Sequence, residues 1–185
     1  MTEATDLGQI AGDYTIDAAH SRLGFVARHA MVTKVRGQFT DVEGQIHVDA
    51  PNPERSSGTV RIKAASINTQ QEDRDAHLRT GDFFDVENHP EITFASRSVQ
   101  DKGSNNYTVT GDLTIRGTTR PVEFDLEFTG LARDPFGNLR AGFEGSTTIN
   151  RKDWGLSWNA ALETGGWLVS DKITVELDVS AIKNA

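Results

Sequence analysis

Apolar and polar residues alternate with a period of two along most of the chain. In residues 122–128 (VEFDLEF), apolar side chains occupy every second position and acids occupy the positions between them. Because successive side chains of a β-strand point to opposite faces, this pattern predicts a strand with one apolar face and one face toward water. Seven other stretches show the same alternation, namely 21–29, 37–49, 59–64, 91–96, 107–117, 139–149 and 172–179.

Turn-forming residues separate these stretches. The connections are rich in Gly, Pro, Asn, Asp and Ser, and the clearest are 51–58, 101–106, 116–121 and 134–138. One apolar face on nearly every strand excludes a parallel sheet that is covered by helices on both sides. Long strands joined mostly by short hairpins favour one sheet that curls on itself. We therefore predict an all-β fold, an eight-stranded antiparallel up-and-down barrel.

One segment, residues 68–94 (NTQQEDRDAHLRTGDFFDVENHPEITF), interrupts the strand pattern and predicts a short helix at 69–80. Thr69 and Glu72 have the spacing of a capping box, and Gly81 is suited to a left-handed helix end. Such a short helix must pack against something to be stable. We therefore predict that it lies across one mouth of the barrel as a lid.

The length of 185 residues predicts a single domain. We assign residues 13–183 to the barrel and expect residues 1–12 to be a flexible N-terminal tail. The opening sequence MTEATDLGQIAGD is polar and acidic and does not resemble a secretory signal. Together with the absence of cysteine, this predicts a cytoplasmic location.

Charge and hydropathy narrow the classes of partner. The net charge of −8 argues against nucleic acid or an anionic membrane surface as a general partner, because both attract basic proteins. No apolar run approaches the roughly 20 residues that a transmembrane helix requires, so the sequence predicts no transmembrane segment.

The barrel interior is the first candidate binding site. An eight-stranded barrel is just wide enough either to be filled by side chains or to hold one slim ligand. Small residues near the apolar faces are compatible with both arrangements. The apolar residues assigned to the interior are Phe25, Phe39, Ile62, Phe94, Val109, Leu113, Phe124, Leu126, Phe143, Ile149, Ile173 and Val175.

The predicted lid and residues 150–171, which contain all three tryptophans, form the second candidate site. The tryptophans either plug one end of the barrel or line a portal for an apolar ligand, and the pattern leaves both interpretations open. The candidate residues of the lid and entrance are Arg74, His77, Leu78, Phe83, Phe84, Trp154, Trp158 and Trp167.

The residues that could carry catalysis or bind a metal form no recognisable motif. The five histidines are scattered, without the spacing of a metal site, and predict no metal and no cofactor. Asp73 and His77 are four residues apart on the predicted helix, which a structural pair explains. No nucleophile elbow or phosphate-binding loop is present in the sequence. These observations favour a protein that is not an enzyme.

Four segments in this order, IDAAHSRLGFVARHAM, RDAHLRTGDFFDVENHPEITF, YTVTGDLTIRGTTRPV and NRKDWGL, resemble the YceI-like family of lipocalin-like, polyisoprenoid-binding proteins. The resemblance runs from about Tyr14 to Ile182. It implies a lipocalin-like barrel with a helical cover, an apolar interior that holds a prenyl lipid, and a homodimer. The resemblance implies two departures from the family: many members are exported, whereas this sequence predicts no signal, and Trp154 occupies the position of the usual Phe.

The predicted function is the non-enzymatic binding, storage or transport of a prenyl-chain lipid, which is a polyisoprenoid, a quinone or a prenyl phosphate. About ten buried hydrocarbon groups would contribute on the order of 8 kcal/mol, whereas an exposed ion pair with a head group adds only ~0–1 kcal/mol. Two alternatives stay open. One is an enzyme that acts on an isoprenoid through the lid His and Asp residues, and the other is a filled β-barrel scaffold for partner binding or stress protection.

Overall fold

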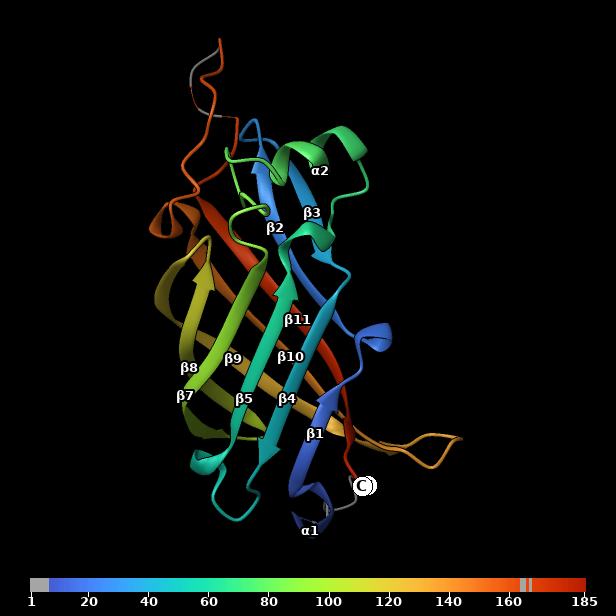
Figure 1. Cartoon of the computed structure of the whole chain (residues 1–185). Coiled ribbons are helices and arrows are strands. Elements are labelled where there is room, and N and C mark those ends of the chain that lie inside the picture. The colour runs from blue at the N-terminus through green and yellow to red at the C-terminus, as the bar shows by residue number, and fades with distance from the viewer. Residues whose placement is uncertain (1–6, 164–165, 167) are drawn as a thin grey trace.

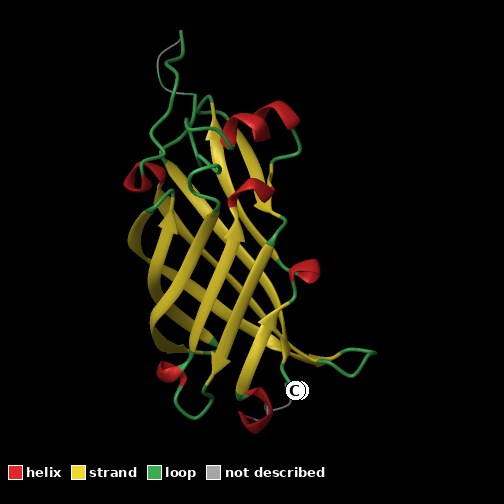
Figure 2. Cartoon of the chain, viewed as in Figure 1, coloured by secondary structure: helices red, strands yellow, loops and turns green. Residues whose placement is uncertain are grey.

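β-Strands make up most of the computed structural model, which describes residues 7–163, 166 and 168–185 (Figures 1 and 2). The strands are β1 (Gly12–Ile16), β2 (Arg22–His29), β3 (Thr33–Phe39), β4 (Val42–Val48), β5 (Ser57–Lys63), β6 (Ile67–Asn68), β7 (Glu91–Gly103), β8 (Asn106–Ile115), β9 (Thr118–Arg133), β10 (Leu139–Asn150) and β11 (Lys172–Lys183). The helices are α1 (Leu7–Ile10) and α2 (Glu72–Leu78), with the 3₁₀-helices η1 (Ala18–His20), η2 (Pro53–Arg55), η3 (Ala64–Ser66) and η4 (Arg151–Trp154).

Eight of the described strands close a barrel. Their order is β1-β4-β5-β7-β8-β9-β10-β11, and the pairing of β1 with β11 joins the two edges of the sheet. All of these pairings are antiparallel. The predicted all-β antiparallel barrel with a short helical lid is therefore confirmed.

Three further strands extend the barrel wall at the lid end. Strand β11 pairs with β1 through residues 181–183 and with β2 through residues 174–178. Strands β1 and β2 are thus two parts of one wall strand, interrupted by η1. Strands β3 and β4 are related in the same way, as are β5 and β6, so the order is up-and-down. Figure 1 shows β2 and β3 at the same end as α2, with α1 at the other end.

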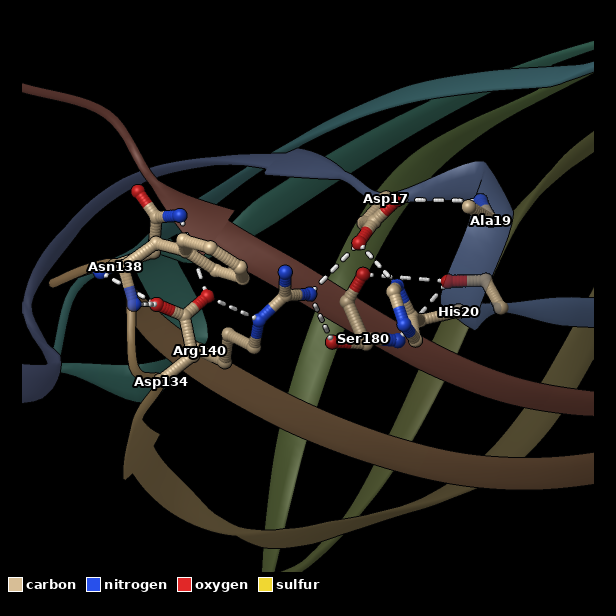
Figure 3. Close-up of polar contacts among 9 residues, drawn as sticks. Asp17, Ala19, His20, Asp134, Asn138, Arg140 and Ser180 are labelled. Atoms are coloured by element: carbon tan, nitrogen blue, oxygen red, sulfur yellow. Dashed lines mark hydrogen bonds and ion pairs between the residues drawn. The ribbon is translucent and has the colours of Figure 1, made fainter.

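A cluster of charged residues fixes the interruption between β1 and β2 (Figure 3). Asp17 caps η1 by accepting a hydrogen bond from the Ala19 N–H, and its other oxygen lies 2.8 Å from Nδ1 of His20. Arg140 donates to Asp17 at 2.7 Å and to Asp134 at 2.8 Å. The hydrogen bonds from Arg140 and then His20 lower the pKa of Asp17. The β9–β10 hairpin is thereby tied to the seam of the barrel.

The N-terminal segment differs from the predicted tail. Residues 7–12, expected to be flexible, form α1 and the beginning of β1. Ile10 is buried, and its carbonyl accepts a hydrogen bond of 2.7 Å from the Tyr14 hydroxyl. Packing of Ile10 with Tyr14 and Phe128 explains why this part is ordered against the barrel. The remainder of the predicted tail, residues 1–6, lies outside the described residues.

The lid helix is shorter than the predicted 69–80. Its N-cap is Gln71, whose side chain accepts a hydrogen bond from the Arg74 N–H, and not Thr69. Thr69 is buried and donates its N–H and its hydroxyl to the carboxylate of Asp75, while its hydroxyl oxygen accepts a hydrogen bond from Nε of Arg74, so it does not cap the helix N–H groups. Gly81 does not adopt a positive φ, and the helix ends at Leu78.

Candidate functional site

An elongated cavity of about 380 Å³ runs along the barrel interior. Its lining extends from Ala50 and Pro53, at the η2 end, to Phe83 and Trp154 at the lid end. The volume falls within the range of roughly 300–1,000 Å³ that is typical of small-molecule sites. Because the lining is almost wholly apolar, the cavity suits a slender hydrocarbon.

The structure brings all the interior candidates together around this cavity. They come from β2, β3, β5 and every strand from β7 to β11. The alternation of side chains along each strand therefore identifies the inner face correctly. The residues are Phe25, Phe39, Ile62, Phe94, Val109, Leu113, Phe124, Leu126, Phe143, Ile149, Ile173 and Val175.

Two glycines of the wall accommodate aromatic rings. Phe25 packs on Gly37, its partner across β2 and β3, and a Cβ at Gly37 would clash with the ring. Phe94 packs on Gly111 in the same manner, and its ring meets Phe124 edge-on at 5.4 Å. The absence of a side chain at these glycines lets the rings lie close to the wall, which leaves the axis of the barrel open.

Four of the lid and entrance candidates, Leu78, Phe83, Phe84 and Trp154, line the lid end of the cavity. Phe84 contacts Phe39 of the barrel edge-on, with ring centroids 5.9 Å apart. Arg74, His77 and Trp158 are not part of the lining. Trp167 lies outside the described residues.

Hydrogen bonds and ring contacts explain why His77 and Arg74 lie behind the lining. His77 Nε2 lies 2.8 Å from a carboxylate oxygen of Asp82, so its partner is Asp82 and not Asp73. The His77 ring packs edge-on against Trp158 at 4.7 Å. Arg74 donates to the hydroxyl and the carbonyl of Thr69. Both side chains therefore hold the lid in place.

A buried arginine that is not among the candidate residues fixes the tryptophan segment at the barrel end. Arg151 donates to the carbonyl oxygens of Ser170 at 2.9 Å, Leu156 at 2.5 Å and Trp158 at 2.9 Å. Burial lowers the pKa of its guanidinium, an effect that the charge of Asp171 opposes. The Arg of the NRKDWGL segment was the available signal, but the sequence does not show which carbonyl groups it contacts.

Trp154 closes the same end from within. It is 3% exposed, and its indole N–H donates a hydrogen bond of 2.9 Å to the carbonyl of Leu113 in β8. Because Trp154 also lines the cavity, it both plugs the barrel and forms part of the wall that a ligand would meet. A phenylalanine at this position could not make this hydrogen bond.

Polar side chains that are not among the candidate residues gather at the η2 end of the cavity. Ser96 accepts a hydrogen bond from the Gly58 N–H, and Ser56 accepts one from the Asp49 N–H, each at 2.9 Å. Asp49, Ser56 and Ser96 all border the cavity. The signal for Ser96 is its spacing from Phe94, which places both side chains on one face of β7. The cavity thus has a polar end and an aromatic end.

Two other kinds of feature are absent from the described part of the chain. No cluster of three or more His, Asp and Glu residues there is arranged to hold a metal ion. Within the same residues, no helix has the length and hydrophobicity to cross a membrane.

Comparison with known proteins places these features in a family. The sequence model of the YceI-like domain matches residues 14–181. A UPF0312 protein of Ectopseudomonas mendocina is 40% identical to this chain over 150 residues, which cover 80% of this chain and 78% of that protein.

Two solved structures share the fold. BcnA from Burkholderia cenocepacia superimposes with a TM-score of 0.79 at 23% identity, and the match covers 89% of this chain and 98% of that chain. A polyisoprenoid binding domain from Saccharophagus degradans superimposes with a TM-score of 0.69 at 17% identity, covering 92% and 98%. At these identities the likeness concerns the fold alone.

Proposed function

We propose, proceeding from the fact that this chain belongs to the YceI-like family, that it binds one prenyl-chain lipid in its barrel and stores or carries it. The observation that carries this proposal is the elongated apolar cavity between η2 and the lid. A scaffold with a filled core would leave no such cavity, so the structure favours a carrier over a filled scaffold.

The energetics favour a ligand that is held mainly by its tail. Burial of hydrocarbon contributes about 0.8 kcal/mol per CH₂ group, and association costs an estimated ~4–15 kcal/mol. A chain of several isoprene units that fills the cavity can exceed this cost, whereas a head group at the surface contributes little. We assign the tail to the aromatic interior near Phe94 and Phe124 and the lid.

The class of ligand follows from the lining and from a structural relative. The S. degradans domain is described as polyisoprenoid binding, and we extend that ligand class to this chain because its own cavity is long and apolar. The interior candidates and Leu78, Phe83, Phe84 and Trp154 are the proposed contacts. A polyisoprenoid, a prenyl quinone and a prenyl phosphate all have such a tail, and the head group tunes the choice among them.

The proposal is tested by isolating the protein without detergent and analysing it by native mass spectrometry. The expected result is a complex that is heavier than the chain by several hundred daltons, together with a prenyl lipid in the organic extract at about one molecule per chain. A bare protein mass and an extract without prenyl lipid would contradict it.

A catalytic role of the lid gains no support from the geometry. His77 is engaged by Asp82 and lies outside the cavity lining. We therefore expect His77→Ala to weaken lipid retention by loosening the lid, with no turnover of the lipid in either protein. Turnover in wild type that the substitution abolishes, with retention intact, would establish the enzyme instead.

The homodimer and the cytoplasmic location stay predictions. Sedimentation equilibrium tests the first and fractionation of cells that express the full chain tests the second. A dimer would form through wall side chains or loops, because closure of the barrel leaves few strand edges for pairing.

A further inference from the structure

The β2–β3 hairpin has a charge opposite to that of the whole protein. The chain has a net charge of −8, whereas the segment 22–39 contains four Arg and Lys residues and no Asp or Glu. Arg22, Arg28, Lys34 and Arg36 occupy alternate positions in the paired register, so all four lie on one face of the hairpin. The opposite face includes Phe25, which lines the cavity.

Within the described part of the chain, only two of these four cations have carboxylate partners. Glu176 of β11 pairs with Arg22 at 3.1 Å and with Arg36 at 3.3 Å. Arg28 and Lys34 lie directly opposite each other across the two strands. Like charges in such a cross-strand pair destabilise a sheet. The Arg28–Lys34 pair is therefore an arrangement that an external anion would stabilise.

The turn that joins the strands is apolar where polar residues are usual. Val32 N–H donates to the carbonyl of His29, and both central residues, Ala30 and Met31, have positive φ, at 52° and 63°. Turns of this type strongly prefer Asn and Gly. Met31 is nevertheless 65% exposed and Val32 is 75% exposed. The turn thus presents two apolar side chains to solvent, and two of its residues, Ala30 and Met31, adopt a conformation that their residue types do not favour.

The basic face and the apolar turn meet at the tip. Arg28 donates a hydrogen bond of 3.1 Å to the carbonyl of Val32, which holds its guanidinium beside the exposed side chains. An apolar tip with cations next to it fits the boundary of an anionic bilayer, where side chains enter the acyl region and cations meet phosphates. Two side chains are too small a surface for a stable protein interface.

The hairpin also connects the tip to the cavity. Phe25 and Ala27 of β2 line the cavity, and the Phe25 ring contacts Phe39, which in turn contacts Phe84 of the lid. Figure 1 shows the hairpin and the lid helix α2 at the same end of the barrel. A membrane held at the tip is therefore close to the boundary between the lid and the barrel wall, where Phe39 contacts Phe84.

We propose that the β2–β3 hairpin docks this protein on anionic membranes through Met31 and Val32, with Arg28 and Lys34 bound to lipid phosphates. The proposal rests on the proposed function for its purpose, since a prenyl lipid resides in membranes. Exposed Glu72 and Asp73 on α2, and Glu163 beyond η4, oppose docking. The molecule must therefore approach the bilayer with the hairpin side first.

Vesicle flotation tests the proposal with the full chain and with vesicles that contain no prenyl lipid. Wild type is expected to float with vesicles of phosphatidylcholine and phosphatidylglycerol, to bind phosphatidylcholine alone weakly, and to dissociate as salt rises. The double variant Arg28→Gln/Lys34→Gln should bind about 25-fold more weakly, at roughly fivefold for each cation lost. A matched control, Lys102→Gln near the end of β7, should bind as wild type does.

A second variant separates docking from folding. Ala30→Asn/Met31→Gly supplies the residues that the turn prefers, so the melting temperature should stay the same or rise while vesicle binding falls at least fivefold. Phe136→Ser, which removes the 88% exposed ring of the β9–β10 turn, should leave binding unchanged. Binding of the turn variant at the wild-type level would overturn the proposal. So would a change in its oligomeric state, which would identify a second copy as the occupant.

The outcome is independent of the proposed function. If the wild type does not bind anionic vesicles but carries a prenyl lipid, the docking proposal is refuted and the carrier proposal is unaffected. Wild type that floats but carries no lipid would refute the carrier alone.

Discussion

The ring of Phe94 lies so close to Gly111 that a Cβ on this glycine would be 2.5 Å from ring atom Cζ. The two residues belong to adjacent strands of the wall, β7 and β8. Gly111 therefore determines how near the wall the ring can lie, and hence how much of the interior stays open.

We expect Gly111→Ala to push the Phe94 ring toward the barrel axis and also to strain the wall, because the added Cβ would lie 2.5 Å from the carbonyl oxygen of Ala95 in β7. Overpacking of this kind should lower the free energy of unfolding by about 1–3 kcal/mol and should reduce the lipid that remains with the purified protein. Urea unfolding and lipid extraction measure the two effects.

Gly58→Ala provides a matched control for this substitution. Gly58 also lines the cavity, but an added Cβ would meet its nearest atoms, in Gln45 and Ile46, only at 3.7 and 3.9 Å. This variant should retain lipid. Equal retention by the Gly111 and Gly58 variants would show that the Phe94 ring does not limit the bore.

Phe124→Asp tests the assignment of inner and outer faces. Phe124 is 6% exposed and lines the cavity, so the substitution places an unpaired carboxylate among apolar groups at a cost of at least about 3 kcal/mol. Both stability and bound lipid should be lost. Phe136→Asp makes the same chemical change at a residue that is 88% exposed, and it should preserve both. An unchanged melting temperature for the Phe124 variant would mean that the faces are reversed.

The barrel and its inner face could be predicted from sequence because alternation reports directly on which side of a strand each residue lies. Phe124 and Phe94 could be assigned to the barrel interior without knowing which strands lie beside theirs. The segments that connect the strands were harder to predict. The helix was predicted to start at Thr69, since its spacing to Glu72 matches a capping box, but the buried carboxylate of Asp75 takes the Thr69 hydroxyl. A local rule cannot anticipate such a tertiary contact.

The polar contributors to the site were hidden for a similar reason. Arg151 bonds carbonyls that come from both sides of the loop it anchors, and the sequence does not show where those carbonyls lie. The partner of His77 was predicted to be Asp73 from helical spacing. The turn after α2 brings Asp82 to the ring instead.

Arg151→Met should loosen the loop that covers the barrel. The substitution keeps an apolar side chain of similar length but leaves the buried carbonyls of Leu156 and Trp158 without their donor. At about 1–3 kcal/mol for each unsatisfied group, we expect a loss of roughly 3–5 kcal/mol, seen by urea unfolding with tryptophan fluorescence as the probe. The exposed neighbour offers the control Lys152→Met, which should change stability little. Equal stability of the two variants would show that Arg151 does not anchor the loop.

Acid should weaken the seam of the barrel through Asp134. Burial opposes ionisation of this group, but hydrogen bonds from Arg140, Asn138 and the Phe136 N–H outweigh it and lower the pKa to about 2. The unfolded chain has a pKa of about 3.9 for Asp. The ionised group therefore stabilises the fold above about pH 4, and this contribution is lost as the pH falls toward 2.

Asp134→Asn removes that contribution. Its unfolding free energy should be lower than that of wild type at neutral pH and should vary less between about pH 4 and pH 2. Urea titrations at several pH values in this range measure how the unfolding free energy of each protein varies with pH. The pKa of Asp17 is also lowered, and this group contributes to the pH dependence of stability that persists in the variant. If the unfolding free energies of the two proteins varied with pH in the same way, Asp134 would not be a source of the acid sensitivity.

The central claim, a hollow apolar bore that encloses a hydrocarbon chain, is tested most directly by a high-resolution crystal structure of protein purified without detergent. We predict continuous, slender electron density from the region of Ala50 and Pro53, past Phe94 and Phe124, to Phe83 and Trp154 under the lid. A bore closed by the protein's own side chains, with no space for such a chain, would contradict the claim.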